Sequence, residues 1–399
     1  VYVMSNKVLG GSLLIAGSAI GAGVLAVPVL TAKGGFFPAT FLYIVSWLFS
    51  MASGLCLLEV MTWMKESKNP VNMLSMAESI LGHVGKISIC LVYLFLFYSL
   101  LIAYFCEGGN ILCRVFNCQN LGISWIRHLG PLGFAILMGP IIMAGTKVID
   151  YCNRFFMFGL TVAFGIFCAL GFLKIQPSFL VRSSWLTTIN AFPVFFLAFG
   201  FQSIIPTLYY YMDKKVGDVK KAILIGTLIP LVLYVLWEVV VLGAVSLPIL
   251  SQAKIGGYTA VEALKQAHRS WAFYIAGELF GFFALVSSFV GVALGVMDFL
   301  ADGLKWNKKS HPFSIFFLTF IIPLAWAVCY PEIVLTCLKY AGGFGAAVII
   351  GVFPTLIVWK GRYGKQHHRE KQLVPGGKFA LFLMFLLIVI NVVSIYHEL

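Results

Sequence analysis

Charged side chains are scarce in this sequence. Asp, Glu, Lys and Arg make up only 11% of its 399 residues, whereas 60% are hydrophobic, and the mean hydropathy is +0.96. Soluble domains carry roughly 25% charged residues, because a surface in water must be polar. The composition therefore excludes a soluble protein and predicts an integral membrane protein.

Clusters of metal-ligating or nucleophilic side chains are also lacking. The seven histidines stand at the ends of apolar runs or in loops, and none has a cysteine or carboxylate at ligand spacing. Most of the nine cysteines stand singly within apolar runs, as small buried side chains do. Only Cys113 and Cys118 share a predicted outer loop, where a disulfide is one alternative. We expect no metal, no organic cofactor and no enzymatic activity.

Long apolar runs fill the chain, so the predicted fold class is all-α. A bilayer core of about 30 Å needs roughly 20 apolar residues for each crossing helix. The eleven predicted spans are 8–31, 37–62, 87–112, 129–146, 151–173, 190–212, 222–247, 271–300, 313–330, 333–359 and 377–397. The longest predicted loops are 66–84, 113–127, 174–189, 248–270 and 360–376.

Basic residues indicate the orientation, because Lys and Arg accumulate on the cytoplasmic side. With a cytoplasmic N-terminus, 19 of the 28 Lys and Arg residues fall in inner segments and eight in outer ones. Eleven spans then place the C-terminus outside. The net charge of +13 follows from this topology and does not indicate nucleic-acid binding, which needs basic residues on one aqueous face.

Two of the predicted spans contain weak helix formers at mid-membrane. The first holds GSAIGAGVLAVP at residues 17–28, and the sixth holds FLAFGFQSIIP at residues 196–206. An unpaired backbone group at this depth costs several kcal/mol. Close helix packing through small residues, such as Gly17 and Gly21 in a GxxxG spacing, is the alternative explanation for either stretch alone.

The two interruptions divide the chain into related blocks. Each opens a block of five spans, over residues 8–173 and 190–359, and residues 377–397 follow as an eleventh helix. Because five is odd, the second block enters from the opposite side and forms an inverted repeat. A helix unwound at mid-membrane offers N–H groups to an anion and carbonyls to a cation. The breaks therefore predict a binding site for an amino-acid zwitterion, with glycines that supply unusual φ values and close approach.

Seven sequence motifs resemble one family across nearly the whole chain. They are GSAIGAGVLAVP, LLEV at 57–60, GTKVIDYCNRFF at 145–156, FGFQSIIP at 199–206, IGTLIPLVLYVLWE at 225–238, SSFVGVALGVMDFLADGL at 287–304, and YAGG with FPTLIVW near 340–359. The sequence resembles the hydroxy and aromatic amino acid permeases, which are bacterial tyrosine and tryptophan transporters of the amino acid, polyamine and organocation superfamily. The resemblance implies a LeuT-type five-plus-five fold in the bacterial inner membrane, and import of tyrosine, tryptophan or phenylalanine by proton symport.

The resemblance also implies which residues bind substrate. The carboxylate site would be Ser18, Ala19, Gly21, Ala22 and Gly23, and the ammonium site would be the carbonyls of Ala198, Phe199 and Gly200. Gln202 stands where the family commonly has histidine, so it either binds substrate or a gate, or caps the broken helix. Phe199, Phe201 and Tyr98 are candidates to pack against an aromatic ring.

The coupling ion has two sets of candidate ligands. Ser287 and Ser288 resemble a hydroxyl pair that completes a cation site in sodium-coupled relatives of the fold, although such hydroxyls also bond to their own helix. Glu238 and Glu278 lie within spans, where an ionisable residue is expected to be functional. Protons are the favoured ion and sodium is the alternative.

Two further charged residues predict an outer gate. Glu107 and Lys339 lie near the outer ends of spans three and ten, and each would relieve the cost of burying the other if they touched. Independent contact with interfacial water, or a pair between Lys339 and Glu278, is the alternative. Beyond substrate and lipid we expect no obligatory protein partner. A transporter-fold nutrient sensor remains the competing function, and a channel is disfavoured because the spans lack a continuous polar path.

Overall fold

A computed structural model describes residues 6–64, 71–116, 126–144, 146–267, 271–304, 306, 310–364 and 372–396. Helices and turns account for the regular structure of these residues, and they contain no strand. Nine helices are long and apolar enough to cross a membrane, and the bent pair α1–α2 makes a tenth when counted as one span. The prediction of an all-α integral membrane protein is therefore confirmed.

The first half of the chain contains eight helices. They are α1 (Asn6–Ala19), α2 (Ala22–Thr31), α3 (Phe36–Trp63), α4 (Met73–Val115), α5 (Ile126–Met143), α6 (Thr146–Phe172), α7 (Pro177–Leu180) and α8 (Trp185–Ile189). The second half opens with the interrupted segment α9 (Phe192–Ala198), η2 (Gln202–Ile204) and α10 (Ile205–Tyr211). The remaining elements are α11 (Val216–Ala244), α12 (Leu247–Ile255), α13 (Ala260–Ala267), α14 (Trp271–Leu304), α15 (Pro312–Cys329), α16 (Val334–Tyr340), η3 (Ala341–Val352), α17 (Phe353–Tyr363) and α18 (Gly377–Tyr396).

Three predicted loops contain helices, and one of them, 174–189, holds the short helices α7 and α8. The segment 66–84 was expected to be a loop, but α4 already begins at Met73, where Asn72 and Ser75 form a capping box. Gly82 kinks this helix with a φ of 84°, a value that only glycine adopts readily. The segment 248–270 likewise contains α13 and most of α12. The helices α12 and α13 are too short or too polar to resemble a membrane span, so hydropathy alone did not predict them.

The breaks of spans one and six lie where the glycines predicted them. The first span turns by 53° between α1 and α2, and Gly21 precedes α2 in an extended conformation. The sixth span is interrupted between α9 and α10, and Pro206 stands in the first turn of α10. A proline costs little there because the first N–H groups of a helix have no intrahelical acceptor.

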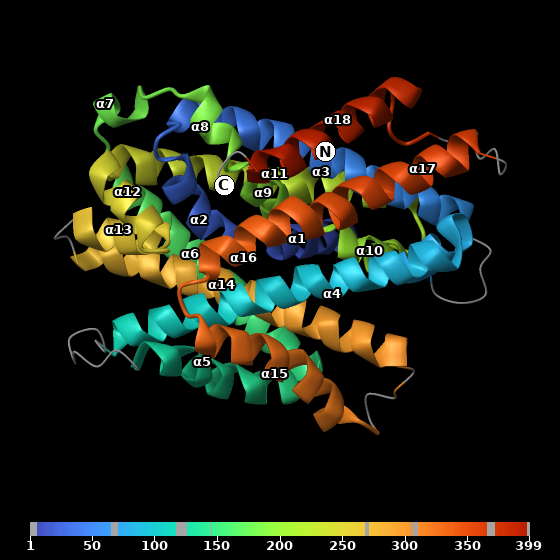
Figure 1. The fold of residues 1–399 in the computed structure, drawn as a ribbon, viewed down its shortest axis with the longest axis horizontal. Coiled ribbons are helices and arrows are strands. Elements are labelled where there is room, and N and C mark those ends of the chain that lie inside the picture. Colours follow the sequence, from blue (N-terminus) through green and yellow to red (C-terminus); the bar gives the residue numbers. More distant parts are fainter. Residues whose placement is uncertain are drawn as a thin grey trace.

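The helices pack around these two broken spans. Figure 1 shows α5 and α15 side by side along one edge of the bundle and α18 along the opposite edge, with α1 and α4 between them. Spans one and six touch through α2 and α9, and α11 packs against both α1 and α3. The breaks are therefore enclosed by neighbouring helices, as buried non-helical backbone requires.

The tenth span is also irregular, and this irregularity could not be predicted from the sequence. Residues Ala341–Val352 form a π-helix, which leaves backbone groups displaced from the ordinary α-helical pattern. Asn391 of α18 is fully buried and its amide donates to the carbonyls of Gly342 and Gly343 at 3.3 and 3.4 Å. The last helix therefore supports the irregular part of span ten.

A buried ion pair links α17 to α3. Arg362 of α17 forms two hydrogen bonds of 2.7 and 2.6 Å with Glu59 of α3, and both side chains are fully buried. The amide of Leu373 also donates to Glu59 at 2.7 Å. Bidentate geometry of this kind compensates the cost of burying both charges.

Candidate functional site

A cavity lies between the broken spans and their neighbours. Its empty volume, including open space at the mouth, is about 620 Å³. Its lining residues are Ser18, Ala19, Gly21, Gly23, Leu96, Phe97, Leu100, Tyr104, Leu197, Ala198, Gly200, Gln202, Ser203, Val292, Ile349 and Ile350. Spans one, three, six, eight and ten therefore all contribute to it.

The break in span one leaves the N-terminus of α2 open toward the cavity. Gly21 is the N-cap of α2 and supplies no side-chain cap, so the first N–H groups, those of Ala22 and Gly23, have no intrahelical acceptor. Gly21 and Gly23 line the cavity. The helix dipole adds positive potential at this end. This arrangement suits a carboxylate.

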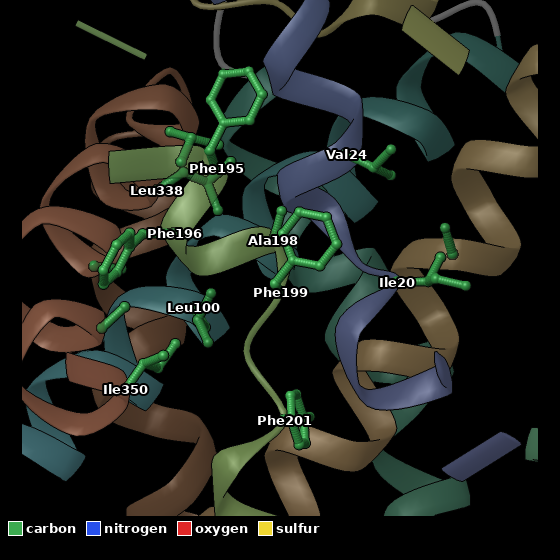
Figure 2. Packing of buried hydrophobic residues seen from close by; sticks show 14 of the residues in the cluster. Ile20, Val24, Leu100, Phe195, Phe196, Ala198, Phe199, Phe201, Leu338 and Ile350 are labelled. Carbon is green, nitrogen blue, oxygen red and sulfur yellow. The ribbon is translucent and has the colours of Figure 1, made fainter. Parts of the chain in front are cut away.

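Carbonyl groups from both breaks face each other across Tyr234 of α11. Its hydroxyl lies 2.8 Å from the carbonyl oxygen of Ala19 and 2.8 Å from that of Ala198. Figure 2 shows Ala198 and Phe199 at the end of α9, beside the segment of span one that carries Ile20. Since a hydroxyl has one proton and each carbonyl has two lone pairs, acceptor capacity remains for an ammonium group.

Gln202 braces the break in span six against α3. Its Oε1 accepts from the amide of Phe201 at 2.9 Å, and its Nε2 donates to Oγ of Ser50 at 3.0 Å and to the Ser50 carbonyl at 3.2 Å. The hydroxyl of Ser50 in turn donates to the carbonyl of Phe199. The geometry supports the capping interpretation of Gln202, although the residue also lines the cavity.

The glycines at the breaks are needed for space and not for unusual dihedral angles. Gly21 has a φ of −153°, and Gly200 is not among the described residues with positive φ. A Cβ on Gly21 would lie 2.7 Å from Ser288 Oγ and 3.2 Å from the hydroxyl of Tyr104. A Cβ on Gly200 would lie 3.1 Å from the carbonyl of Leu197. The conformational part of the prediction is therefore wrong, and the close-approach part agrees with the structure.

Aromatic side chains reach the cavity from α4. Phe97 and Tyr104 line it, together with Leu96 and Leu100. The spacing of residues 96, 100 and 104 places them on one helix face. This stripe could not be predicted from the sequence, because α4 is apolar on every side here and periodicity does not indicate which side faces the breaks.

The three aromatic residues predicted at the site lie elsewhere. Phe199 packs edge-on against Tyr234, with ring centroids 5.2 Å apart, and Phe201 packs against Gly54 of α3. Tyr98 donates its hydroxyl to the carbonyl of Leu318 in α15 at 3.0 Å. None of the three lines the cavity among the described residues.

The serine pair in α14 contacts span one through one member only. The hydroxyl of Ser288 donates to the carbonyl of Ile20 in the break. The hydroxyl of Ser287 donates to the carbonyl of Ala284 in its own helix at 3.2 Å. The structure therefore brings Ser288 to the break, whereas Ser287 has the local bond that was its alternative explanation.

Glu238 of α11 is fully buried beside α2, the second half of span one. Its carboxyl forms hydrogen bonds with the hydroxyls of Thr31 in α2 and Tyr43 in α3, the latter at 3.2 Å. One helical turn separates it from Tyr234, which joins the two breaks. Glu238 is therefore connected to the site through both α2 and α11.

Glu278 and Glu107 meet at a different place. Arg114, in the last turn of α4, donates to Glu278 at 2.6 Å and to Glu107 at 3.1 Å. The predicted partner of Glu107 was Lys339, which lies in α16. The topology had assigned Arg114 to an outer loop, so its role as the partner of both carboxylates was missed. The disulfide candidate Cys113 lies buried in the same turn, and Cys118 is outside the described residues.

The sequence is similar to transport proteins along its whole length. The Tryptophan/tyrosine permease family model matches residues 4–394. The chain is 33% identical to "Tyrosine-specific transport system 1" of Haemophilus influenzae, over 96% of this chain and 94% of that protein. It is 29% identical to "Tyrosine-specific transport system 2" of the same organism, over 96% and 95%. It is also 29% identical to that organism's "Tryptophan-specific transport protein", over 98% and 96%.

Proposed function

Because the chain belongs to the tryptophan/tyrosine permease family, we propose that it imports an aromatic amino acid, tyrosine foremost, by proton symport with alternating access. The observation that carries this proposal is the cavity formed by both helix breaks. An open helix N-terminus and a pair of backbone carbonyls line it together. Tryptophan and phenylalanine are the other candidate substrates, since the cavity offers apolar surface for any ring.

The bound zwitterion would lie across the two breaks. Its carboxylate would accept from the N–H groups of Ala22 and Gly23 at the start of α2. Its ammonium would donate to the carbonyls of Ala19, Ala198 and Gly200, which lie at the breaks. Backbone groups would thus recognise the part that all amino acids share, and side chains would select among them.

The side chain of the substrate would extend toward α4. Phe97 and Tyr104 border the cavity on this side, and aromatic pairs add about 0.5–1.5 kcal/mol beyond area burial. Val292, Ile349 and Ile350 complete an apolar wall. Such a wall favours a large ring over a small polar side chain, because a polar group buried here would lack a partner.

Packing between the spans supports eleven crossings in a LeuT-type inverted repeat. The fifth span, α6, packs against the eighth, α14, just as the tenth span packs against the third, α4. These two contacts are equivalent when spans six to ten repeat spans one to five. The helix α5 would be the fourth crossing, since its part His128–Met143 is apolar although it falls short of 18 residues.

Glu238 is the proposed proton carrier. The Thr31 hydroxyl lies 2.9 Å from the carbonyl of Val27 and also contacts Glu238. When Thr31 gives its single proton to Val27, the bond to Glu238 requires a proton on the carboxyl. An ionised carboxylate buried without a cation would cost several kcal/mol. Movement of α2, which carries Thr31, would therefore change the affinity for this proton.

Sodium symport and nutrient sensing are the alternatives. A sodium ion in the break would share the carbonyl of Ile20 with the hydroxyl of Ser288, which donates to that oxygen. A sensor would bind the same zwitterion without moving it, so binding alone does not separate it from a transporter. The proposed location is the bacterial inner membrane, with the N-terminus cytoplasmic and the C-terminus periplasmic.

Uptake into proteoliposomes tests the proposal. We expect labelled tyrosine to accumulate when an inward proton gradient is imposed without sodium, and to stop when a protonophore is added. Leucine should accumulate less than tyrosine, tryptophan or phenylalanine. Uptake that needs sodium and ignores the proton gradient would reverse the coupling assignment. Specific tyrosine binding without uptake under any gradient would favour the sensor.

A further inference from the structure

A buried charge cluster lies apart from the proposed substrate site. It consists of Glu107 and Arg114 at the end of α4, Glu262 on α13, and Glu278 on α14. None of these residues lines the cavity. At most 7% of the surface of each residue is exposed. The cluster therefore joins three separate elements through charges that are shielded from water.

One guanidinium stands among three carboxylates. Arg114 Nε lies 2.6 Å from Glu278 Oε1 and 3.9 Å from Glu262 Oε2, and Arg114 Nη2 lies 3.1 Å from Glu107 Oε1. Thr259, just before α13, donates to Glu107 at 3.1 Å. Fully ionised, these four side chains would carry two excess negative charges, and a buried charge without compensation costs several kcal/mol.

Two carboxylate oxygens of the cluster have no hydrogen bond. Glu262 Oε2 and Glu278 Oε2 are both buried and unsatisfied, although buried polar atoms are almost always paired. The side chains that carry them are 10% and 7% exposed. A proton on either oxygen would remove one excess charge and supply a donor.

We propose that Glu262 and Glu278 share a proton-binding site that latches α13 onto α4 and α14. With the proton bound, Arg114 holds the remaining carboxylates and α13 stays docked. When the proton leaves to solvent, three carboxylates share the single guanidinium of Arg114. Glu262, the one farthest from the guanidinium, is then driven away with its helix. Among the described residues, no three His, Cys, Asp or Glu side chains are placed so that they could hold a metal ion.

The position of α13 connects the proton site to span one. The helix packs against α2, the half of span one whose N-terminus faces the cavity, and α12 packs against both α2 and α13. Release of α13 would therefore free the outer surface of α2. The proton site would thus control one end of the broken span independently of what the cavity binds.

Other ionisable groups surround the proton site that holds α13. Among the described residues, they lie on this part of α4 and on the elements packed against α4, α13 and α14. They are Glu107, Arg114, His128, Glu238, Lys254, Lys265, Tyr274 and Lys339. Glu238 is engaged by Thr31 and Tyr43. The ammonium of Lys265 lies 5.5 Å from the ring centroid of Tyr274, and its exposed side chain is screened by solvent. α2 itself carries no ionisable side chain.

Hydrogen exchange of α13 tests the latch in the purified full-length protein, without amino acid. After correction for intrinsic exchange, protection of residues 260–267 should fall about tenfold for each pH unit from about pH 5 to about pH 8, as expected when opening releases one proton. In Glu262→Gln the protection should remain high and lose this pH dependence, because the neutral amide imitates the protonated acid. Glu78→Gln, an exposed residue paired with Lys86 in α4, should behave like the unaltered protein.

Two results would overturn the proposal. One is protection of α13 that does not change with pH in the unaltered protein. The other is weaker protection in Glu262→Gln than in the unaltered protein at every pH, which would mean that the ionised carboxylate clamps the helix. Infrared spectra give a second readout. A stretching band of a protonated carboxyl that is present in the unaltered protein and missing in Glu262→Gln should persist over the pH range in which α13 stays protected, and its absence at pH 5 would contradict the proposal. Neither experiment depends on transport, so its outcome is separate from that of the uptake assay.

Discussion

The space around Gly21 allows a matched pair of substitutions to test the site. In Gly21→Ala the new Cβ would lie 2.7 Å from Ser288 Oγ and 3.1 Å from Ser288 Cβ. The serine hydroxyl could rotate away, but only by losing its bond to the carbonyl of Ile20. The Cβ of Ser288 is fixed to the backbone of α14 and cannot rotate away. Span one and α14 must therefore also move apart. The strain therefore falls on the break itself.

The control is four residues earlier in the same span, within α1. In Gly17→Ala the new Cβ would meet only Met157, at 3.5 and 3.6 Å from its terminal atoms, which is ordinary contact with a flexible side chain. Both changes add one methyl group to a glycine of span one, Gly17 within α1 and Gly21 at the N-cap of α2. The pair therefore separates crowding at the break from any general effect of replacing glycine in span one.

Overpacking of a closely packed site costs about 1–3 kcal/mol, which corresponds to about a 5- to 150-fold increase in Kd. We expect Gly21→Ala to weaken tyrosine binding by a factor in this range, and Gly17→Ala to leave the Kd within about twofold. Equilibrium binding of labelled tyrosine to the purified, monodisperse protein measures both. Equal Kd values for the two variants would refute the argument that the backbone at Gly21 meets the ligand.

Three further outcomes follow from other contacts. Glu238→Gln should abolish tyrosine accumulation driven by a proton gradient while exchange of internal for external tyrosine persists; loss of both activities together would contradict a role limited to coupling. Ser288→Ala should leave uptake independent of sodium, and an acquired or lost sodium requirement would show that the hydroxyl pair holds an ion. Glu59→Gln should lower the free energy of unfolding by about 3–5 kcal/mol, because it leaves Arg362 buried without its carboxylate; an unchanged thermal midpoint would show that water reaches this pair.

The backbone breaks could be predicted from the sequence because they depend on local chemistry. Glycine and proline at mid-membrane weaken a helix wherever they stand, and residues 17–28 and 196–206 are interrupted in the structure. Their occurrence at the first position of each predicted five-span block added a second, independent signal. Element boundaries followed hydropathy for most spans. The exceptions are α4, which extends beyond its apolar core through a capped and kinked N-terminal segment, and the short helices α7, α8, α12 and α13, which lie in predicted loops.

Side-chain partners could not be predicted in the same way. The predicted pair of Glu107 and Lys339 relied on similar depth in the membrane, but depth does not determine the rotation of a helix about its axis. Arg114 lies seven residues after Glu107, two turns along the same helix face, and it was assigned to a loop because charge marked the end of the apolar run. A buried arginine in the last turn of a span looks in sequence like an ordinary interfacial one.

The aromatic wall was missed for a related reason. Phe199 and Phe201 are close in sequence to the break, yet their rings pack against α11 and α3. Phe97 and Tyr104 are remote in sequence and reach the cavity because α4 crosses it. Proximity in the chain therefore predicted the backbone of the site, and tertiary packing determined its side chains.

A cryo-electron microscopy structure of the protein with saturating tyrosine would test the central claim most directly. We predict density for the amino acid between the two breaks, with its carboxylate at the N–H groups of Ala22 and Gly23 and its ring between Phe97, Tyr104 and Ile350. The same grid preparation without tyrosine provides the comparison map. Tyrosine density at any other position, with the cavity between α2 and α9 unchanged from the tyrosine-free map, would contradict the account.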